Sequence, residues 1–233
     1  MNQSIRNSLL ILSLLFINSI IYSQDIKVLT EDCEVALSDG FNEKSLNDYQ
    51  FTDQSHWLIT KNGESGKDLK CVFDFNDVPN EYFPSEVAFL TNRLYGDFIM
   101  EFDYLQKNRE FTIRDICVLF GYQDSTHYYF AQAASKDGKY NHNIFKVEND
   151  RPVKIGESKN RGVIWNYQKW SHIVVVRKIE VPLLELYIDG ELILSSSSDN
   201  GSEGKLGFGT YGSGFKIDNL KVWVPKELKE KKE

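Results

Sequence analysis

The sequence predicts an all-β fold in which two antiparallel sheets pack face to face. Short runs rich in aromatic and β-branched residues recur along the chain, with turn residues between them, as strands prefer. Asp189-Gly190 lies between two such runs and is typical of a type I′ hairpin turn. The sequence contains no amphipathic helix of four turns and no internal repeat. These observations favour a β-sandwich over mixed or helical folds.

The clearest predicted strand is Phe98 to Gln106. Aromatic and apolar residues at alternate positions, beginning with Phe98, are interleaved with Glu101 and Asp103. This period of two predicts one face toward a core and one partly polar face. The other expected strands are 116–122, 128–134, 143–147, 172–177, 184–188 and 191–194, with 205–211 and 215–224 as a closing pair.

The start of the chain predicts export. An apolar run over residues 9–21 follows Arg6, and polar residues interrupt it. The run is too short and too polar for a good transmembrane span. We therefore interpret 1–23 as a signal peptide, 24–225 as the β-sandwich and 226–233 as a charged tail, and we expect a periplasmic or secreted protein. An uncleaved membrane anchor is the alternative.

Charge and cysteine content narrow the function classes. A formal net charge of −7 disfavours general nucleic-acid binding. There is no polybasic segment to hold the mature chain on a membrane. Cys33, Cys71 and Cys117 allow at most one disulfide in an exported protein, and their spacing does not say which pair forms it. No CxxC motif or Cys/His cluster supports a zinc site.

Several segments resemble the laminin-G-like branch of the concanavalin A-like lectin/glucanase superfamily. They are Tyr95-Gly96-Asp97-Phe98, Phe120-Gly121-Tyr122-Gln123-Asp124, Tyr167-Gln168-Lys169-Trp170, Leu186-Tyr187-Ile188-Asp189-Gly190, Gly204-Lys205-Leu206-Gly207-Phe208 and Ile217-Asp218-Asn219-Leu220. The resemblance implies a two-sheet jelly-roll sandwich. It leaves activity open, because this fold hosts lectins, hydrolases, lyases and adhesion modules. It also implies a structural Ca²⁺ site, for which Asp39 and Asp218 are the candidate ligands.

A narrower resemblance covers residues 126–132, 141–145 and 149–151. These segments are similar to small exported proteins of Bacteroidetes that degrade algal and plant polysaccharides. The resemblance implies a saccharide partner that contains uronic acid, of the ulvan type, and a lyase or dehydratase activity that requires no cofactor.

Residue chemistry points to β-elimination on a uronate. This reaction needs a group that neutralises the sugar carboxylate, a base for the C5 proton and an acid for the leaving oxygen at C4. The candidate catalytic residues are His127, Tyr129 and His142. The candidate substrate-binding residues are Arg114, Tyr128, Gln132, Asn143, Arg151 and Trp165. Strand alternation puts His127 and Tyr129 on one face, and Tyr128 and Gln132 on the other.

Two other functions compete with this hypothesis. A non-catalytic carbohydrate-binding or adhesion module would use aromatic platforms. Trp165 is the main candidate, and Trp57, Trp170, Tyr122 and Tyr140 are the others. A glycoside hydrolase would use Glu101 and Asp103, but Gln106 occupies the third position of the hydrolase motif and cannot act as a general acid. Each candidate residue also has a purely structural interpretation, as core or surface.

Overall fold

The computed structural model describes residues 29–42, 45–61, 63–64, 66–72, 83–107, 114–149 and 151–226. The predicted signal peptide lies outside these residues, as does the predicted tail after Lys226. The elements are β1 (Cys33–Asp39), η1 (Ser45–Asp48), β2 (Tyr49–Phe51), η2 (Gln54–His56), β3 (Trp57–Thr60), β4 (Asp68–Cys71), β5 (Glu86–Leu90), β6 (Phe98–Gln106), β7 (Asp115–Asp124), β8 (His127–Ala134), β9 (Asn143–Glu148), β10 (Arg151–Lys154), β11 (Glu157–Ser158), β12 (Ser171–Lys178), β13 (Leu183–Ile188), β14 (Glu191–Ser196), β15 (Lys205–Thr210) and β16 (Phe215–Pro225).

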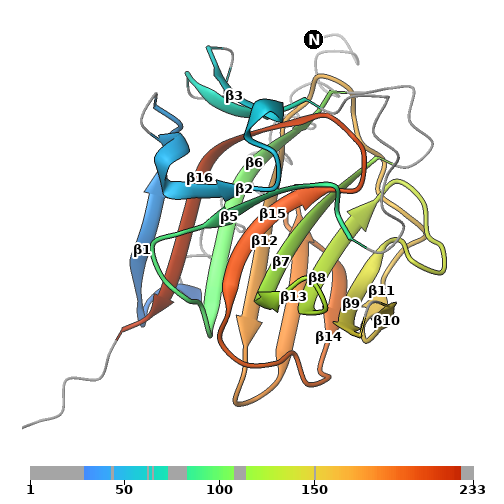
Figure 1. Ribbon diagram of the computed structural model, residues 1–233. Coiled ribbons are helices and arrows are strands. Elements are labelled where there is room, and N and C mark those ends of the chain that lie inside the picture. The colour runs from blue at the N-terminus through green and yellow to red at the C-terminus, as the bar shows by residue number, and fades with distance from the viewer. Residues whose placement is uncertain are drawn as a thin grey trace, which may run out of the picture. The chain divides into compact units, whose positions relative to one another are not determined.

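The segment Val35–Val224 is built from two antiparallel sheets, which confirms the predicted fold class. The nine-stranded sheet has the order β11-β14-β13-β12-β6-β16-β4-β3, and β1 pairs with β16. The seven-stranded sheet has the order β10-β9-β8-β7-β15-β5-β2. In Figure 1, β5, β15 and β7 lie in front of β6 and β12, so the two sheets form two layers.

The predicted strands are confirmed with small shifts of their ends. β6 spans the predicted nine residues, and the β13–β14 turn has φ values of 51° at Asp189 and 85° at Gly190, as a type I′ turn requires. The predicted closing pair is wrong, because β15 belongs to the seven-stranded sheet and β16 to the nine-stranded one. The residue pattern predicts where each strand lies in the sequence, but it does not predict which strand pairs with which.

The main core lies between the two sheets. It takes alternate residues from each strand, such as Phe102 and Tyr104 of β6, Phe120 of β7, Val175 of β12 and Phe208 of β15, all fully buried. Burial of this much apolar surface is the main favourable term in folding. A second, smaller apolar cluster lies on the outer face of the seven-stranded sheet.

Among the described residues, 29–34 and 225–226 belong to a small unit separate from Val35–Val224. Within its described part, the Lys226 backbone N–H donates to the Asp32 carbonyl at 3.0 Å, and the Lys226 ammonium donates to the Glu31 carbonyl at 2.7 Å. None of the described helices is long and apolar enough to cross a bilayer.

None of the three cysteines takes part in a disulfide, so the disulfide that the sequence allowed does not form. Cys71 lies in the core between the sheets, whereas Cys117 belongs to the outer cluster of the seven-stranded sheet. The two side chains are therefore buried in different apolar clusters.

Candidate functional site

The outer face of the seven-stranded sheet carries an aromatic surface. Strand register places one row of residues straight across five strands, in the order Phe145, Phe130, Leu119, Gly207 and Phe89. Phe130 and Phe145 stack with ring centroids 4.8 Å apart. Facing residues of neighbouring strands share a face, so this row forms a continuous apolar floor.

Partly exposed rings lie on this floor. Phe83, Tyr122 and Tyr211 are half-buried and pack against the buried cluster. The ring of Tyr122, on β7, lies 4.5 Å from that of Phe89, on β5, so it spans the intervening strand β15. Gly207 of β15 has no side chain to block this approach. We call Phe83, Phe89, Tyr122, Tyr128, Phe130 and Tyr211 the aromatic face.

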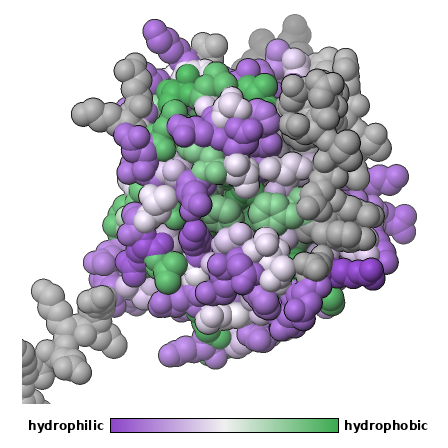
Figure 2. All heavy atoms as spheres, in the orientation of Figure 1, coloured by the Kyte–Doolittle hydropathy of each residue, from purple (hydrophilic) through white to green (hydrophobic). Residues whose placement is uncertain are grey.

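Polar groups surround the aromatic face. The Lys205 ammonium lies 6.0 Å from the centre of the Phe89 ring and donates to the Gln50 side chain at 2.9 Å. Lys205 has no carboxylate partner among the residues that the structure describes. In Figure 2, hydrophobic residues lie near the middle of the view, with hydrophilic residues to the left of them and below them.

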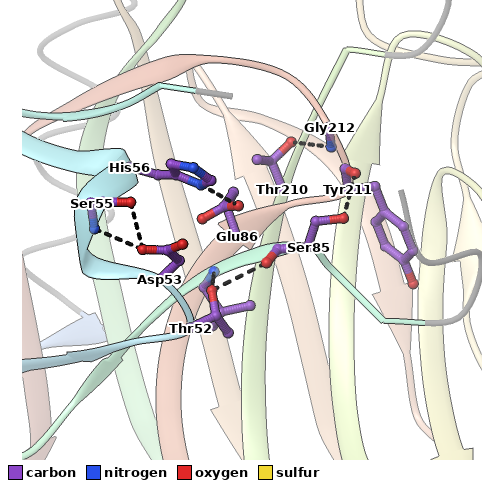
Figure 3. A network of polar contacts seen from close by, with 10 residues as sticks. Thr52, Asp53, Ser55, His56, Ser85, Glu86, Thr210, Tyr211 and Gly212 are labelled. Atoms are coloured by element: carbon purple, nitrogen blue, oxygen red, sulfur yellow. Dashed lines mark hydrogen bonds and ion pairs between the residues drawn. The ribbon is translucent and has the colours of Figure 1, made fainter. Parts of the chain in front are cut away.

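Tyr211 is held at the edge of the aromatic face by its backbone. The Ser85 hydroxyl donates to the Tyr211 carbonyl at 3.1 Å, and the Thr52 hydroxyl donates to the Ser85 carbonyl at 3.1 Å (Figure 3). The Tyr211 hydroxyl is buried and makes no hydrogen bond within the described structure, and burial raises its pKa. A buried hydroxyl without a partner costs folding free energy.

The structure places Tyr128, Gln132 and Asn143, three predicted substrate-binding residues, on this outer side of the sheet. All three are buried. The Gln132 amide donates to Asp115 at 2.7 Å, and its oxygen accepts from the His142 backbone at 3.3 Å. Tyr128 is thus part of the aromatic face, and Gln132 and Asn143 lie on the same side of the sheet. None of the three side chains is presented to solvent.

His142, a predicted catalytic residue, is fully buried just before β9, with a positive φ of 52°. Its Nδ1 accepts from the Ala134 backbone at 3.2 Å, and its Nε2 lies 2.7 Å from the Asn160 side-chain oxygen. These partners require a neutral ring with the proton on Nε2. Burial lowers the His142 pKa, in agreement with this state. The ring thus ties β8 to the loop that contains Asn160.

Trp165 is also buried, at 5% exposure, so it cannot serve as the open sugar platform that the sequence suggested. Its ring lies 4.7 Å from the Tyr104 ring, and its indole N–H donates to the Arg114 carbonyl at 3.0 Å. The Arg114 side chain is partly exposed, and its Nε finds no hydrogen-bond acceptor in the described structure. His142, Trp165 and Arg114 therefore lie at one end of the sandwich.

The remaining predicted residues lie at the opposite end of β8. His127 and Gln132 are five positions apart on this strand, which corresponds to about 17 Å. His127 and Arg151 both pair with Glu148 of β9, so all three lie in one row. His127 is exposed and contacts Asp124 at 3.1 Å, and Arg151 is exposed on the edge strand.

Tyr129 lies beside this row, as the alternation with His127 predicted. Its ring stacks on Phe120 in the core. Lys146 of β9 lies opposite Tyr129 of β8, with its ammonium 6.0 Å from the centre of the Tyr129 ring. Burial raises the pKa of the Tyr129 hydroxyl, and the positive charge of Lys146 opposes this shift without cancelling it. The structure thus brings together His127, Tyr129 and Arg151, with Lys146 as an addition, and separates them from His142.

The carboxylates of the hydrolase hypothesis lie on the outer face of the nine-stranded sheet. His172 bridges them, with Nδ1 2.8 Å from Asp103 and Nε2 3.5 Å from Glu101. Burial lowers the His172 pKa, but the hydrogen bonds to Asp103 and Glu101 outweigh it and raise the pKa to about 9. Gln106 points into the core, where it accepts from Tyr104. The motif is therefore split between two faces, and its third position has no carboxyl group.

The predicted calcium ligands have other partners. Asp39 is buried and accepts from the Phe41 backbone, the Ser45 hydroxyl and the Tyr49 hydroxyl at 2.7–2.9 Å. Asp218 is fully buried and accepts from the Asn219 backbone at 2.8 Å. Within the described ranges, no group of three or more His, Cys, Asp or Glu residues could hold a metal ion. The calcium site stays a prediction.

Comparison with known proteins supports the fold. No family model and no curated protein matches the sequence. Carbohydrate-binding module CBM66 from Bacillus subtilis has 17% identity and a TM-score of 0.52, over 76% of this chain and 96% of that one. Peanut lectin, solved with a nonapeptide, has 11% identity and a TM-score of 0.53, over 82% and 98%. A Bacillus subtilis protein of unknown function with a galectin-like fold has 12% identity and a TM-score of 0.53, over 82% and 97%. The chain therefore has the concanavalin A-like jelly-roll fold.

Proposed function

We propose that this protein binds a saccharide on the aromatic face. The observation that carries the proposal is the set of half-buried rings, Phe83, Tyr122 and Tyr211, packed on a buried aromatic layer. Rings fixed in this way lose little conformational entropy when a ligand stacks on them, and sugar rings offer an apolar C–H face for such stacking. The similarity in fold to a carbohydrate-binding module and a lectin adds support.

Lys205 favours an acidic saccharide. Its ammonium lies beside the Phe89 ring, and its described side-chain contacts are this ring and the neutral Gln50 side chain. A uronate stacked on the rings could place its carboxylate against this cation, and a charge-assisted hydrogen bond is stronger than a neutral one. In a protein with a net charge of −7, such a local cation matters for attracting an anionic polymer.

Titration calorimetry of the pure protein with uronate-containing oligosaccharides, and separately with a neutral glucan, tests the proposal. We expect Tyr122→Ala to weaken saccharide binding at the aromatic face by about tenfold or more, because aromatic residues dominate such contacts. We expect Lys205→Gln to weaken only uronate binding, by about fivefold, with a smaller dependence on salt.

Matched controls come from the other sheet. Tyr187 and Lys70 have comparable exposure and lie on strands of the nine-stranded sheet. Tyr187→Ala and Lys70→Gln should leave binding unchanged. Equal losses in the control and test variants, or no saccharide binding by the wild-type protein, would contradict the proposal.

A second candidate function is β-elimination at the His127 end of β8. The observation that favours it is the row of His127, Glu148 and Arg151, with Tyr129 and Lys146 beside it. Lys146 and Arg151 would neutralise the sugar carboxylate, and His127 would remove the C5 proton. The electron pair of the C5–H bond forms the C4=C5 double bond as the C4–O bond breaks. Tyr129 would protonate the leaving oxygen.

An absorbance assay for the unsaturated uronate separates the two functions. If elimination occurs, absorbance rises with uronate oligosaccharides, Tyr129→Phe abolishes the rise and the affinity for substrate persists. Tyr122→Ala would serve as the comparison, since it removes a ring from the other face of the sheet. A wild-type protein that binds these oligosaccharides and forms no product would rule out this second function.

A further inference from the structure

A pocket lies outside both surfaces described above. It has a volume of about 380 Å³ and lies between the loop over residues 160–166 and the β13–β14 hairpin. Pockets for small molecules in proteins range from about 300 to about 1,000 Å³, so this one could hold one or two sugar rings. Its lining residues are Asn160, Gly162, Val163, Ile164, Asn166, Ser171, Ile188, Asp189, Glu191 and Ile193.

The loop that forms one wall is anchored on both sides. The Asn160 oxygen accepts from His142 Nε2 at 2.7 Å and from the Gly162 backbone at 3.1 Å. The Val163 backbone donates to the Ala134 carbonyl at 2.8 Å, and Trp165 is fixed in the core. Between these anchors, Ile164 stays 87% exposed. The wall is therefore preorganised, with an apolar side chain held out at the pocket.

The opposite wall is also fixed. The Asp189 carboxylate accepts from the His172 backbone at 2.8 Å, and the Asp189 backbone donates to the His172 carbonyl at 2.8 Å. These bonds hold the hairpin turn against the start of β12 and leave the second carboxylate oxygen of Asp189 without a described donor.

Several polar groups of the lining have no partner in the described part of the chain. The Asn166 amide, the Ser171 hydroxyl and the Glu191 carboxylate make no hydrogen bond there, and neither does the Asn160 side-chain nitrogen. The lining thus offers both donors and acceptors, and its remaining residues are mostly isoleucine and valine. Hydroxyl groups pair with both kinds of polar group, and the C–H face of a sugar packs on apolar side chains.

The charge of the lining limits the charge that a ligand can have. It contains two carboxylates, Asp189 and Glu191, and no lysine, arginine or histidine. An anionic ligand would be repelled, whereas hydroxyl groups donate well to carboxylates. We propose that this pocket is a second saccharide site, specific for a sugar unit without a carboxylate. The site does not depend on the aromatic face, and it would let one protein contact the neutral and the acidic units of a mixed polysaccharide.

Ligand-observed NMR on the full chain tests the proposal. The probes are the methyl glycosides of glucose, galactose, mannose and rhamnose, together with glucosamine and methyl glucuronide. In the Tyr122→Ala variant, whose aromatic face is impaired, we expect at least one neutral or amino sugar to bind, with methyl glucuronide weaker by about tenfold or more. We expect Asn166→Ala and Glu191→Gln, both at exposed positions, to lower that affinity by about fivefold or more.

Two comparisons make the outcome decisive. Tyr122→Ala should leave neutral-sugar binding at this pocket unchanged, so the failure of one saccharide site is distinguishable from the failure of the other. Glu191→Gln should reduce glucosamine binding more than glucose binding if the amino group is recognised. The proposal is overturned if none of these sugars binds to Tyr122→Ala, if methyl glucuronide binds best to that variant, or if both pocket variants bind neutral sugars like the wild type.

Discussion

Replacing Arg177 by Met is expected to lower the free energy of unfolding by about 3–5 kcal/mol. Arg177 is 1% exposed, and its guanidinium uses all five N–H donors. Nε donates to the Asn200 side-chain oxygen at 3.2 Å. The other four hydrogens go to the backbone carbonyls of Tyr95, Gly96, Asn200 and Ser202, at 2.7–3.2 Å.

The size of this effect follows from burial. Met keeps the apolar stem of the side chain but removes one donor from each of five oxygens in a water-poor region, of which the Tyr95 carbonyl keeps the Gly204 backbone N–H. It also removes the contact of the guanidinium with the Phe120 ring, 5.1 Å away. Because small domains are stable by only about 5–15 kcal/mol, a loss of this size is a large share of the total.

Urea denaturation at neutral pH measures the change. Arg177→Lys should lie between the wild type and Arg177→Met, because an ammonium has three donors and cannot match a planar fork. Arg161 is exposed and serves as the matched control, since Arg161→Met should change stability by no more than about 0.5 kcal/mol. A Met variant within about 1 kcal/mol of the wild type would show that the carbonyl groups find other donors.

The fold was largely predictable from the sequence because strand patterns are local. The alternation in Phe98–Gln106 placed β6 correctly, and Asp189-Gly190 identified the β13–β14 hairpin. Pairing between distant strands is a tertiary property. β15 and β16 are consecutive in the chain but belong to different sheets, and no local pattern separates a hairpin from such a crossover.

The candidate sites were predictable only in part. Alternation correctly put His127 and Tyr129 on one face, and Tyr128 and Gln132 on the other. It could not show that Gln132 and His142 are buried, or that they form hydrogen bonds with partners 10–18 positions away. Phe89 and Lys205 were missed because neither lies near the histidine and tyrosine cluster in sequence. The alternating glycines of β15 were the available signal, since a strand with Gly207 and Gly209 on one face leaves room for rings from its neighbours.

Asp115 is expected to be the second most sensitive position. It is buried beneath the aromatic face and accepts from the Thr210 hydroxyl at 2.6 Å, from the Gln132 amide at 2.7 Å and from the Tyr211 backbone at 3.3 Å. Asp115→Ala would leave these donors unpaired, so we expect a loss of about 2–4 kcal/mol in the free energy of unfolding. Asp115→Asn keeps one acceptor oxygen and should lose less.

The pH dependence of stability separates these two variants from the wild type. Burial raises the pKa of the Asp115 carboxyl above its ordinary value of 3.8, although hydrogen bonds from Thr210 and Gln132 oppose the shift. The native state therefore holds this proton more tightly than the unfolded chain. The resulting stabilisation is fully present below pH 3.8 and is lost as pH rises through the native pKa. Neither Asp115→Asn nor Asp115→Ala has this component, so subtracting their stability profiles from the wild-type profile isolates it.

The same variant connects stability to binding. Asp115 holds the Tyr211 backbone and orients Gln132, so its loss should loosen the edge of the aromatic face while the pocket near Asn166 keeps its own anchors. Under conditions where Asp115→Ala is fully folded, we expect weaker uronate binding and unchanged binding of the neutral sugar. Calorimetry at a temperature well below the unfolding midpoint checks this. Equal weakening of both ligands would mean that Asp115 acts through global stability, and its special relation to the aromatic face would be disproved.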